Sequence, residues 1–178
     1  MIRIAILGDI GSGKTFISNN FGYPVFNADY EVSKIYKNDK KTFYKLNKKL
    51  PKHINSFPIN KKEIIEAIFA NKTNLKKIVG IVHKEISKRL KIFLKKNKKK
   101  PFVILDIPLL LENKINNKND ILIFVDSKRN EIDKRLKRRS NFDKKLLNKF
   151  KKLQLKLDYK KKKSQFIIKN NFTKKSVI

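Results

Sequence analysis

The segment GDIGSGKT, residues 8–15, has the residue types and spacing that hold a nucleoside triphosphate. It fits a glycine, four residues, a glycine, a lysine and a hydroxyl residue, between an apolar strand and a helix. Glycine permits positive φ and leaves room for phosphate, and successive amides form an anion-binding nest. The lysine supplies charge for the β- and γ-phosphates, and the threonine hydroxyl binds Mg²⁺. We therefore expect a nucleoside triphosphate and Mg²⁺ as ligands, with the nucleotide held by Gly8, Gly11, Ser12, Gly13, Lys14, Thr15 and Phe16.

An ordinary glycine turn is the alternative. Three of the five glycines of the chain fall in this octet, which disfavours that interpretation. The segment predicts triphosphate binding but leaves open whether the chain is a hydrolase, a switch or a small-molecule kinase.

Three carboxylates follow other strand candidates. Asp29 comes after residues 24–27, while Asp106 and Glu112 lie in and after the apolar run at 102–107. Ligands of a parallel sheet gather where its strands end. Asp29 is therefore a candidate base for an acceptor hydroxyl, or else a helix N-cap. Asp106 is a candidate for the Mg²⁺ shell together with Thr15, and Glu112 is either functional or a surface charge.

The elements that position these residues alternate between strand and helix. Apolar runs predict strands at residues 2–7, 24–27, 102–107, 121–125 and 166–168. Helical spacing is found at residues 14–21, 28–36, 40–50, 61–70, 75–96, 131–139 and 142–163, and a turn-like stretch at 53–60. This order predicts an α/β fold with a parallel sheet and helices on both faces. His83 lies in the central helical stretch, where a lone histidine is more often structural.

The composition sets further limits. The chain has 178 residues, no cysteine and a formal net charge of +31. Such a charge favours phosphate-bearing ligands, but the spread of lysines along the chain also fits compositional drift. Basic runs are not interleaved with aromatic residues, so we expect no specific nucleic-acid partner. No apolar run approaches the roughly 20 residues that span a bilayer, so we expect a cytoplasmic protein without a membrane partner. We also expect a monomer or a weak oligomer.

The motifs together resemble the dephospho-coenzyme A kinase family. The matching stretches are GDIGSGKT, NAD (27–29), HKEI (83–86), IPLLLE (107–112), KRLKRRS (134–140), LQ (153–154) and IIKNN (167–171). The resemblance covers residues 2–171 and implies phosphorylation of the ribose 3′-hydroxyl of dephospho-CoA by ATP, giving CoA and ADP. It also implies a single P-loop NTPase-type domain. Its core is expected at about residues 1–57 and 101–178, with a helical substrate-binding insert at about 58–100 and a helical lid at about 142–163.

The resemblance also implies roles for single residues. Asp29 matches the base, and Lys14 and Arg139 match the groups that reach the transferred phosphate. The implied substrate contacts are Asp29, His83, Glu112 and Gln154, and the implied contact near the adenine is Asn170.

Several positions depart from the family pattern. The departures are Asn27 for an acid, Lys84 for a proline, Ser140 for an aspartate, Lys160 for an arginine and Phe172 for a glycine. Asp9 is also unusual beside a phosphate loop, and we expect its carboxylate to be turned away or matched by a lysine. The loop, Asp29 and PLLLE are intact, so an active enzyme is expected. The alternatives are another small-molecule or nucleoside monophosphate kinase, a nucleic-acid-stimulated ATPase, or a non-catalytic homologue.

Overall fold

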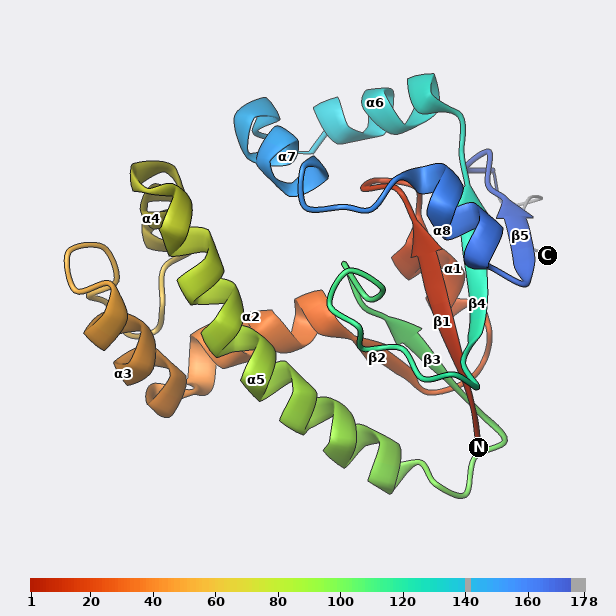
Figure 1. Cartoon of the computed structure of the whole chain (residues 1–178), viewed down its shortest axis with the longest axis horizontal. Coiled ribbons are helices and arrows are strands. Elements are labelled where there is room, and N and C mark those ends of the chain that lie inside the picture. Colours follow the sequence, from red (N-terminus) through yellow and green to blue (C-terminus); the bar gives the residue numbers. More distant parts are fainter. Residues whose placement is uncertain (140–141, 174–178) are drawn as a thin grey trace. The chain divides into compact units, whose positions relative to one another are not determined.

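A computed structural model describes residues 1–139 and 142–173 of the chain. The chain forms two compact units (Figure 1). The first, here the sheet unit, comprises Met1–Asn27 and Asn97–Ile178, and the second, the helical unit, comprises Ala28–Lys96. Ser140, one of the departures from the family pattern, lies outside the described residues.

The sheet unit is built on five parallel strands. They are β1 (Ile2–Gly8), β2 (Val25–Asn27), β3 (Phe102–Asp106), β4 (Ile121–Asp126) and β5 (Phe166–Lys169), in the order β2-β3-β1-β4-β5. In the register, Ile4 of β1 lies opposite Ile104 of β3 and Ile121 of β4. The central strands read as continuous apolar runs because both of their faces are covered. The predicted parallel sheet is confirmed.

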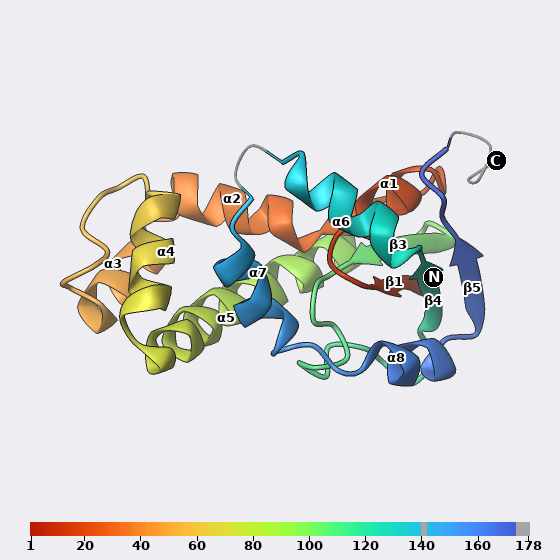
Figure 2. The same ribbon diagram turned by 90° about the horizontal axis from the view of Figure 1, so that it is seen from above.

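Helices cover both faces of this sheet. Figure 2 shows α1 (Lys14–Asn19) on one side and α8 (Leu157–Lys163) on the other. Ile17 of α1 packs into a buried cluster with residues of the three central strands, namely Ile4, Ile6, Ile104, Ile123 and Val125. Among the described residues, the unit has two further helices, α6 (Arg129–Lys137) and α7 (Lys144–Lys151).

The prediction of helix throughout residues 142–163 is wrong in one respect, because α7 and α8 are separate helices. The backbone N–H of Leu155, between them, donates to the Glu112 carboxylate at 2.9 Å. A helix continuing through this point would direct that N–H to a carbonyl four residues back. Glu112 therefore satisfies a donor in the break between the two helices.

The helical unit consists of α2 (Ala28–Asn38), α3 (Lys40–Lys49), α4 (Lys61–Ala70) and α5 (Lys72–Lys96). The long α5 packs against each of the other three. It does so through a buried stripe at helical spacing: Ile78, Val82, Ile86 and Leu90. None of the described helices is both long and apolar enough to cross a membrane.

Candidate active site

The glycine loop joins β1 to α1 and is supported from the end of β5. Asn170 donates from its side-chain amide to the carbonyl oxygen of Ser12 at 2.9 Å. The hydroxyl of Ser127 donates to the same carbonyl at 3.0 Å. Gly13 has φ +92°, and a Cβ there would collide with the Asn170 amide nitrogen. Glycine is needed at this position for its left-handed backbone and for this close approach.

The Lys14 ammonium lies against the loop itself. It donates to the carbonyl oxygen of Asp9 at 2.7 Å and lies 3.4 Å from that of Gly8. A flexible lysine with three donors can exchange these carbonyls for phosphate oxygens. The loop thus holds its cation at the edge of the phosphate nest.

Asp106 joins three segments at the carboxyl end of the sheet. Its Oδ2 accepts from the Thr15 hydroxyl at 2.6 Å and from the side-chain amide of Asn27 at 2.7 Å. Only 3% of Asp106 is exposed. The structure therefore brings together Thr15 and Asp106, the two predicted metal-site residues.

This contact also gives a physical reason for the departure at Asn27. A second carboxylate beside Asp106 would place two like charges against each other and favour protonation of one of them. An amide instead donates a hydrogen bond to the single acid. The site therefore contains a single carboxylate, that of Asp106, and two neutral side chains that donate to it.

The residues present suit Mg²⁺. Hydroxyl and carboxylate oxygens are its preferred protein ligands, and it usually takes one or two of them together with phosphates and waters. Within residues 1–139 and 142–173, no cluster of three or more histidine, cysteine or acidic side chains could hold a metal. This absence does not conflict with a site of one hydroxyl and one carboxylate.

Asp9 is matched by an arginine rather than by a lysine. Its Oδ2 accepts from the guanidinium of Arg129, on α6, at 2.9 Å, and its Oδ1 accepts from the Ile10 backbone N–H at 2.7 Å. The Asp9 side chain is 8% exposed, and that of Arg129 is 56% exposed. Arg129 also pairs with Asp133, one helical turn further on, at 3.2 Å. Sequence reasoning missed Arg129, since only its pairing with Asp133 is visible from helical spacing.

Glu112 and Lys160 form a buried ion pair. Their closest atoms are 2.6 Å apart, and their side chains are 9% and 4% exposed. Glu112 also accepts the Leu155 N–H through Oε1, whereas its buried Oε2 has no hydrogen-bond partner among the described residues. Lys160, which stands where the family has an arginine, is thus directed at Glu112.

The other predicted residues belong to different elements of the two units. Arg139 follows α6 and is exposed, and Gln154 lies half-buried in the break between α7 and α8. Asp29 and His83 belong to the helical unit. Asp29 is exposed in the first turn of α2, which begins at Ala28, so it is not the N-cap of that helix. Burial lowers the pKa of His83, on α5, below its ordinary value.

Comparison with known proteins decides the family. A family model described as dephospho-CoA kinase matches residues 2–175. The chain belongs to the dephospho-CoA kinase family. A dephospho-CoA kinase from Wolbachia pipientis is 34% identical over 98% of this chain and 91% of its own length. One from Rickettsia typhi is 32% identical over 94% of this chain and 87% of its own length.

Solved structures support the same fold. A crystal structure of a protein from Thermus thermophilus matches with a TM-score of 0.79 at 23% identity, covering 99% of this chain and 92% of that one. A dephospho-CoA kinase from Campylobacter jejuni matches with a TM-score of 0.64 at 22% identity, covering 98% and 91%. The resemblance of the sequence motifs to this family is confirmed. The chain is a kinase of coenzyme A biosynthesis that phosphorylates dephospho-CoA with ATP.

Proposed function

We propose that the chain carries out this transfer with the glycine loop as the donor site and Asp29 as the base for the ribose 3′-hydroxyl. The observation that carries the proposal is the convergence of Thr15, Asn27 and Asp106 beside the loop. It joins the hydroxyl of the phosphate-binding motif to an acid at the end of β3, as metal-assisted phosphoryl transfer requires. The products are CoA and ADP.

In the donor site, the amides from Gly11 to Thr15 bind the β- and γ-phosphates. The Lys14 ammonium moves from the Asp9 carbonyl to the γ-phosphate, where its charge offsets the charge that develops during transfer. Asn170 and Ser127 hold the Ser12 carbonyl, which keeps the loop in shape during this exchange. Thr15 and Asp106 would hold Mg²⁺, which would supply positive charge to offset the charge that develops on the phosphates.

Asp29 supplies the carboxylate on the acceptor side. It follows Asn27, a member of the Asp106 network, by two residues and is exposed in the first turn of α2. A carboxylate within hydrogen-bond reach of the 3′-hydroxyl orients it for in-line attack and accepts its proton.

The lid, about residues 142–163, and Arg139 complete the donor side. Lys160 is held by Glu112 in a buried pair, so we assign to Arg139, which is exposed after α6, the lid-side contact to the transferred phosphate. Arginine suits this role because its planar donors match phosphate oxygens. The Oε2 of Glu112 is buried and has no hydrogen-bond partner in the part of the chain that the structure describes, which supports a substrate contact, since a buried carboxylate oxygen gains from a hydroxyl donor.

The helical insert, about residues 58–100, would hold the pantetheine and adenosine parts of the acceptor. His83 lies in this segment, and its lowered pKa keeps it neutral at pH 7. A neutral imidazole offers one donor and one acceptor, so His83 would contact polar atoms rather than act as a cation. Gln154 and Asn170 are the proposed contacts to the acceptor and to the adenine end of ATP, respectively.

A charge-neutral substitution at Asp29 tests the base. Asp29→Asn is expected to lower kcat by about 100-fold or more and to leave the dissociation constant of ATP unchanged. Glu66→Gln is the matched control, because Glu66 is an exposed acid on α4 of the same unit. A near-wild-type kcat for Asp29→Asn would remove Asp29 from this role.

A further inference from the structure

A groove of about 590 Å³ lies within the helical unit, between α3 and α5. This volume is in the range of small-molecule sites, which run from about 300 to 1,000 Å³. The residues that line it are Thr42, Lys45, Lys48, Lys49, Lys76, Lys77, Gly80, Ile81, Lys84, Glu85 and Lys88. No residue assigned to the donor site is among them.

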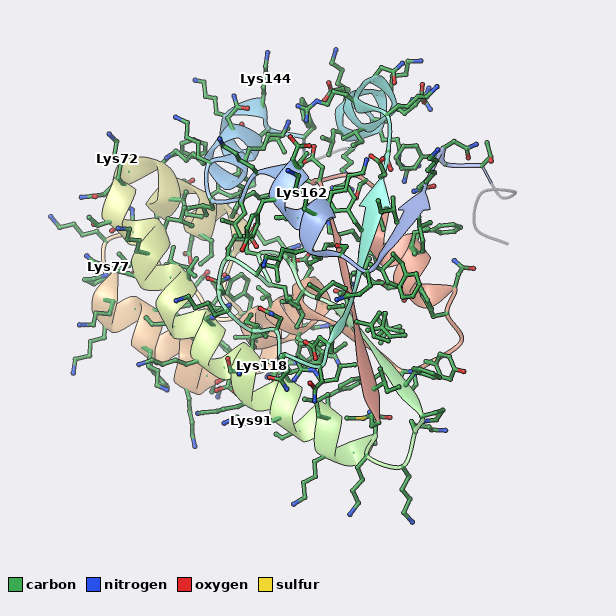
Figure 3. The ribbon with its side chains drawn as sticks, turned by 45° about the vertical axis from the view of Figure 1, so that its right-hand side comes forward. Lys72, Lys77, Lys91, Lys118, Lys144 and Lys162 are labelled. Atoms are coloured by element: carbon green, nitrogen blue, oxygen red, sulfur yellow. The ribbon has the colours of Figure 1, made fainter. Side chains whose placement is uncertain are left out.

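Lysines dominate this lining. Seven of its eleven residues are lysine, whereas lysine and arginine together make up 46 of the 178 residues of the chain. Figure 3 shows that Lys72, Lys77 and Lys91 all project outward from α5, but of these only Lys77 lines the groove. The groove therefore concentrates a charge that is otherwise spread along the helices.

This charge is largely uncompensated within the helical unit. The single acid of the lining, Glu85, lies 3.5 Å from Lys88 and 3.9 Å from Arg89. Within the described part of the chain, the other six groove lysines form no ion pair. Like charges held in one concave surface raise the local potential and attract anions.

We propose that this groove binds a small molecule carrying several phosphate groups. Ammonium groups bind phosphate as point charges on flexible stems, which suits a chain of phosphates better than one fixed oxyanion. The lining has no aromatic side chain on which bases could stack, and this disfavours a single-stranded nucleic acid. One of the groove lysines, Lys84, stands where the family pattern has proline.

The five glycines of the chain provide the readout. Labelling with ¹⁵N-glycine gives amide signals for Gly8, Gly11 and Gly13 in the phosphate loop, Gly22 after α1, and Gly80 in the groove. Gly80→Ala assigns the groove signal, because a Cβ at Gly80 meets no atom within 4 Å. Titration of the whole chain with inorganic tripolyphosphate is expected to move the Gly80 signal to saturation, at concentrations that differ from those for the loop glycines.

Two triple variants separate the groove from general charge. Lys45→Gln/Lys77→Gln/Lys84→Gln removes three groove lysines and is expected to weaken the Gly80 response at least tenfold while the loop glycines respond as before. Lys61→Gln/Lys62→Gln/Lys91→Gln removes three exposed lysines of the same unit outside the lining, and its Gly80 response is expected to change less than twofold.

Each other outcome counts against the proposal. An equal loss in both variants, or the same shift with sodium chloride of matched ionic strength, would mean diffuse screening rather than a site. A tighter response to single-stranded DNA than to tripolyphosphate would assign the groove to nucleic acid. A response to dephospho-CoA without one to tripolyphosphate would make the groove part of the acceptor site.

Discussion

The pairing of Asp9 with Arg129 yields a quantitative prediction about ATP binding. Asp9 places a buried carboxylate in a loop that must accept a triphosphate, and Arg129 is the cation bound to it. The substitution Arg129→Gln leaves that negative charge uncompensated beside the phosphates. Like charges at close range oppose each other, so the variant is expected to bind ATP more weakly.

The exposure of the two partners sets the size of this effect. Exposed ion pairs contribute about 0.2–1 kcal/mol, whereas breaking a buried pair costs about 3–5 kcal/mol. Asp9 is buried but more than half of the Arg129 side chain is exposed, so solvent screens the pair in part. We expect a loss of about 1–2 kcal/mol, which corresponds to a dissociation constant for ATP raised roughly 5- to 30-fold.

A second substitution tests whether the Asp9 charge is the cause. Asp9→Asn removes the charge but keeps a side-chain oxygen for the Ile10 N–H. The double variant Asp9→Asn/Arg129→Gln is therefore expected to bind ATP within about threefold of the wild type. Asp133→Asn is the matched control, because it removes the other partner of Arg129 without touching Asp9.

Calorimetric titration with a non-hydrolysable ATP analogue gives the dissociation constant, and steady-state kinetics gives KM for ATP. The reasoning predicts a rise in both with a smaller change in kcat. It is refuted if Arg129→Gln alters the dissociation constant less than twofold, or if the double variant is no better than the single one.

Two further predictions concern other residues. Asp106→Asn removes the carboxylate from the network with Thr15 and Asn27 and is expected to raise the half-saturating Mg²⁺ concentration roughly 10- to 100-fold, so an unchanged Mg²⁺ dependence of the rate would contradict its place in the metal site. Burial lowers the pKa of His83, so its imidazole is expected to titrate below 6.5 by NMR, with His53→Gln assigning the two histidine signals. Just below pH 6.5 the unfolded state binds more protons than the folded state, so the free energy of unfolding rises with pH there, and His83→Asn is expected to flatten that slope. A midpoint of the His83 NMR titration at or above 6.5 would contradict this prediction.

The parts of the protein that could be predicted from sequence are those encoded in contiguous residues. The octet at residues 8–15 carries its whole chemistry in one loop, and largely apolar runs of three to six residues mark all five strands of the sheet. Helical spacing along residues 75–96 likewise anticipates α5, whose buried stripe needs only its own periodicity.

The contacts between residues that lie far apart along the chain could not be predicted from the sequence. Asn27 donates to Asp106, 79 residues away, because β2 and β3 are neighbours in the sheet, an order that strand patterns alone do not contain. Arg129 meets Asp9 from 120 residues away, and nothing in its local sequence distinguishes Arg129 among the 46 basic residues of the chain. The break between α7 and α8 also involves a distant acid, Glu112.

The central claim is that this chain phosphorylates dephospho-CoA with ATP despite its departures from the family pattern. The most direct measurement is ADP release by the purified protein with ATP and Mg²⁺, in the presence and absence of dephospho-CoA, with CoA quantified by mass spectrometry. We predict ADP release that depends on dephospho-CoA, matched by one CoA per ADP and abolished in a folded Lys14→Ala variant. Folded protein that binds ATP but shows no ADP release dependent on dephospho-CoA would contradict the assignment.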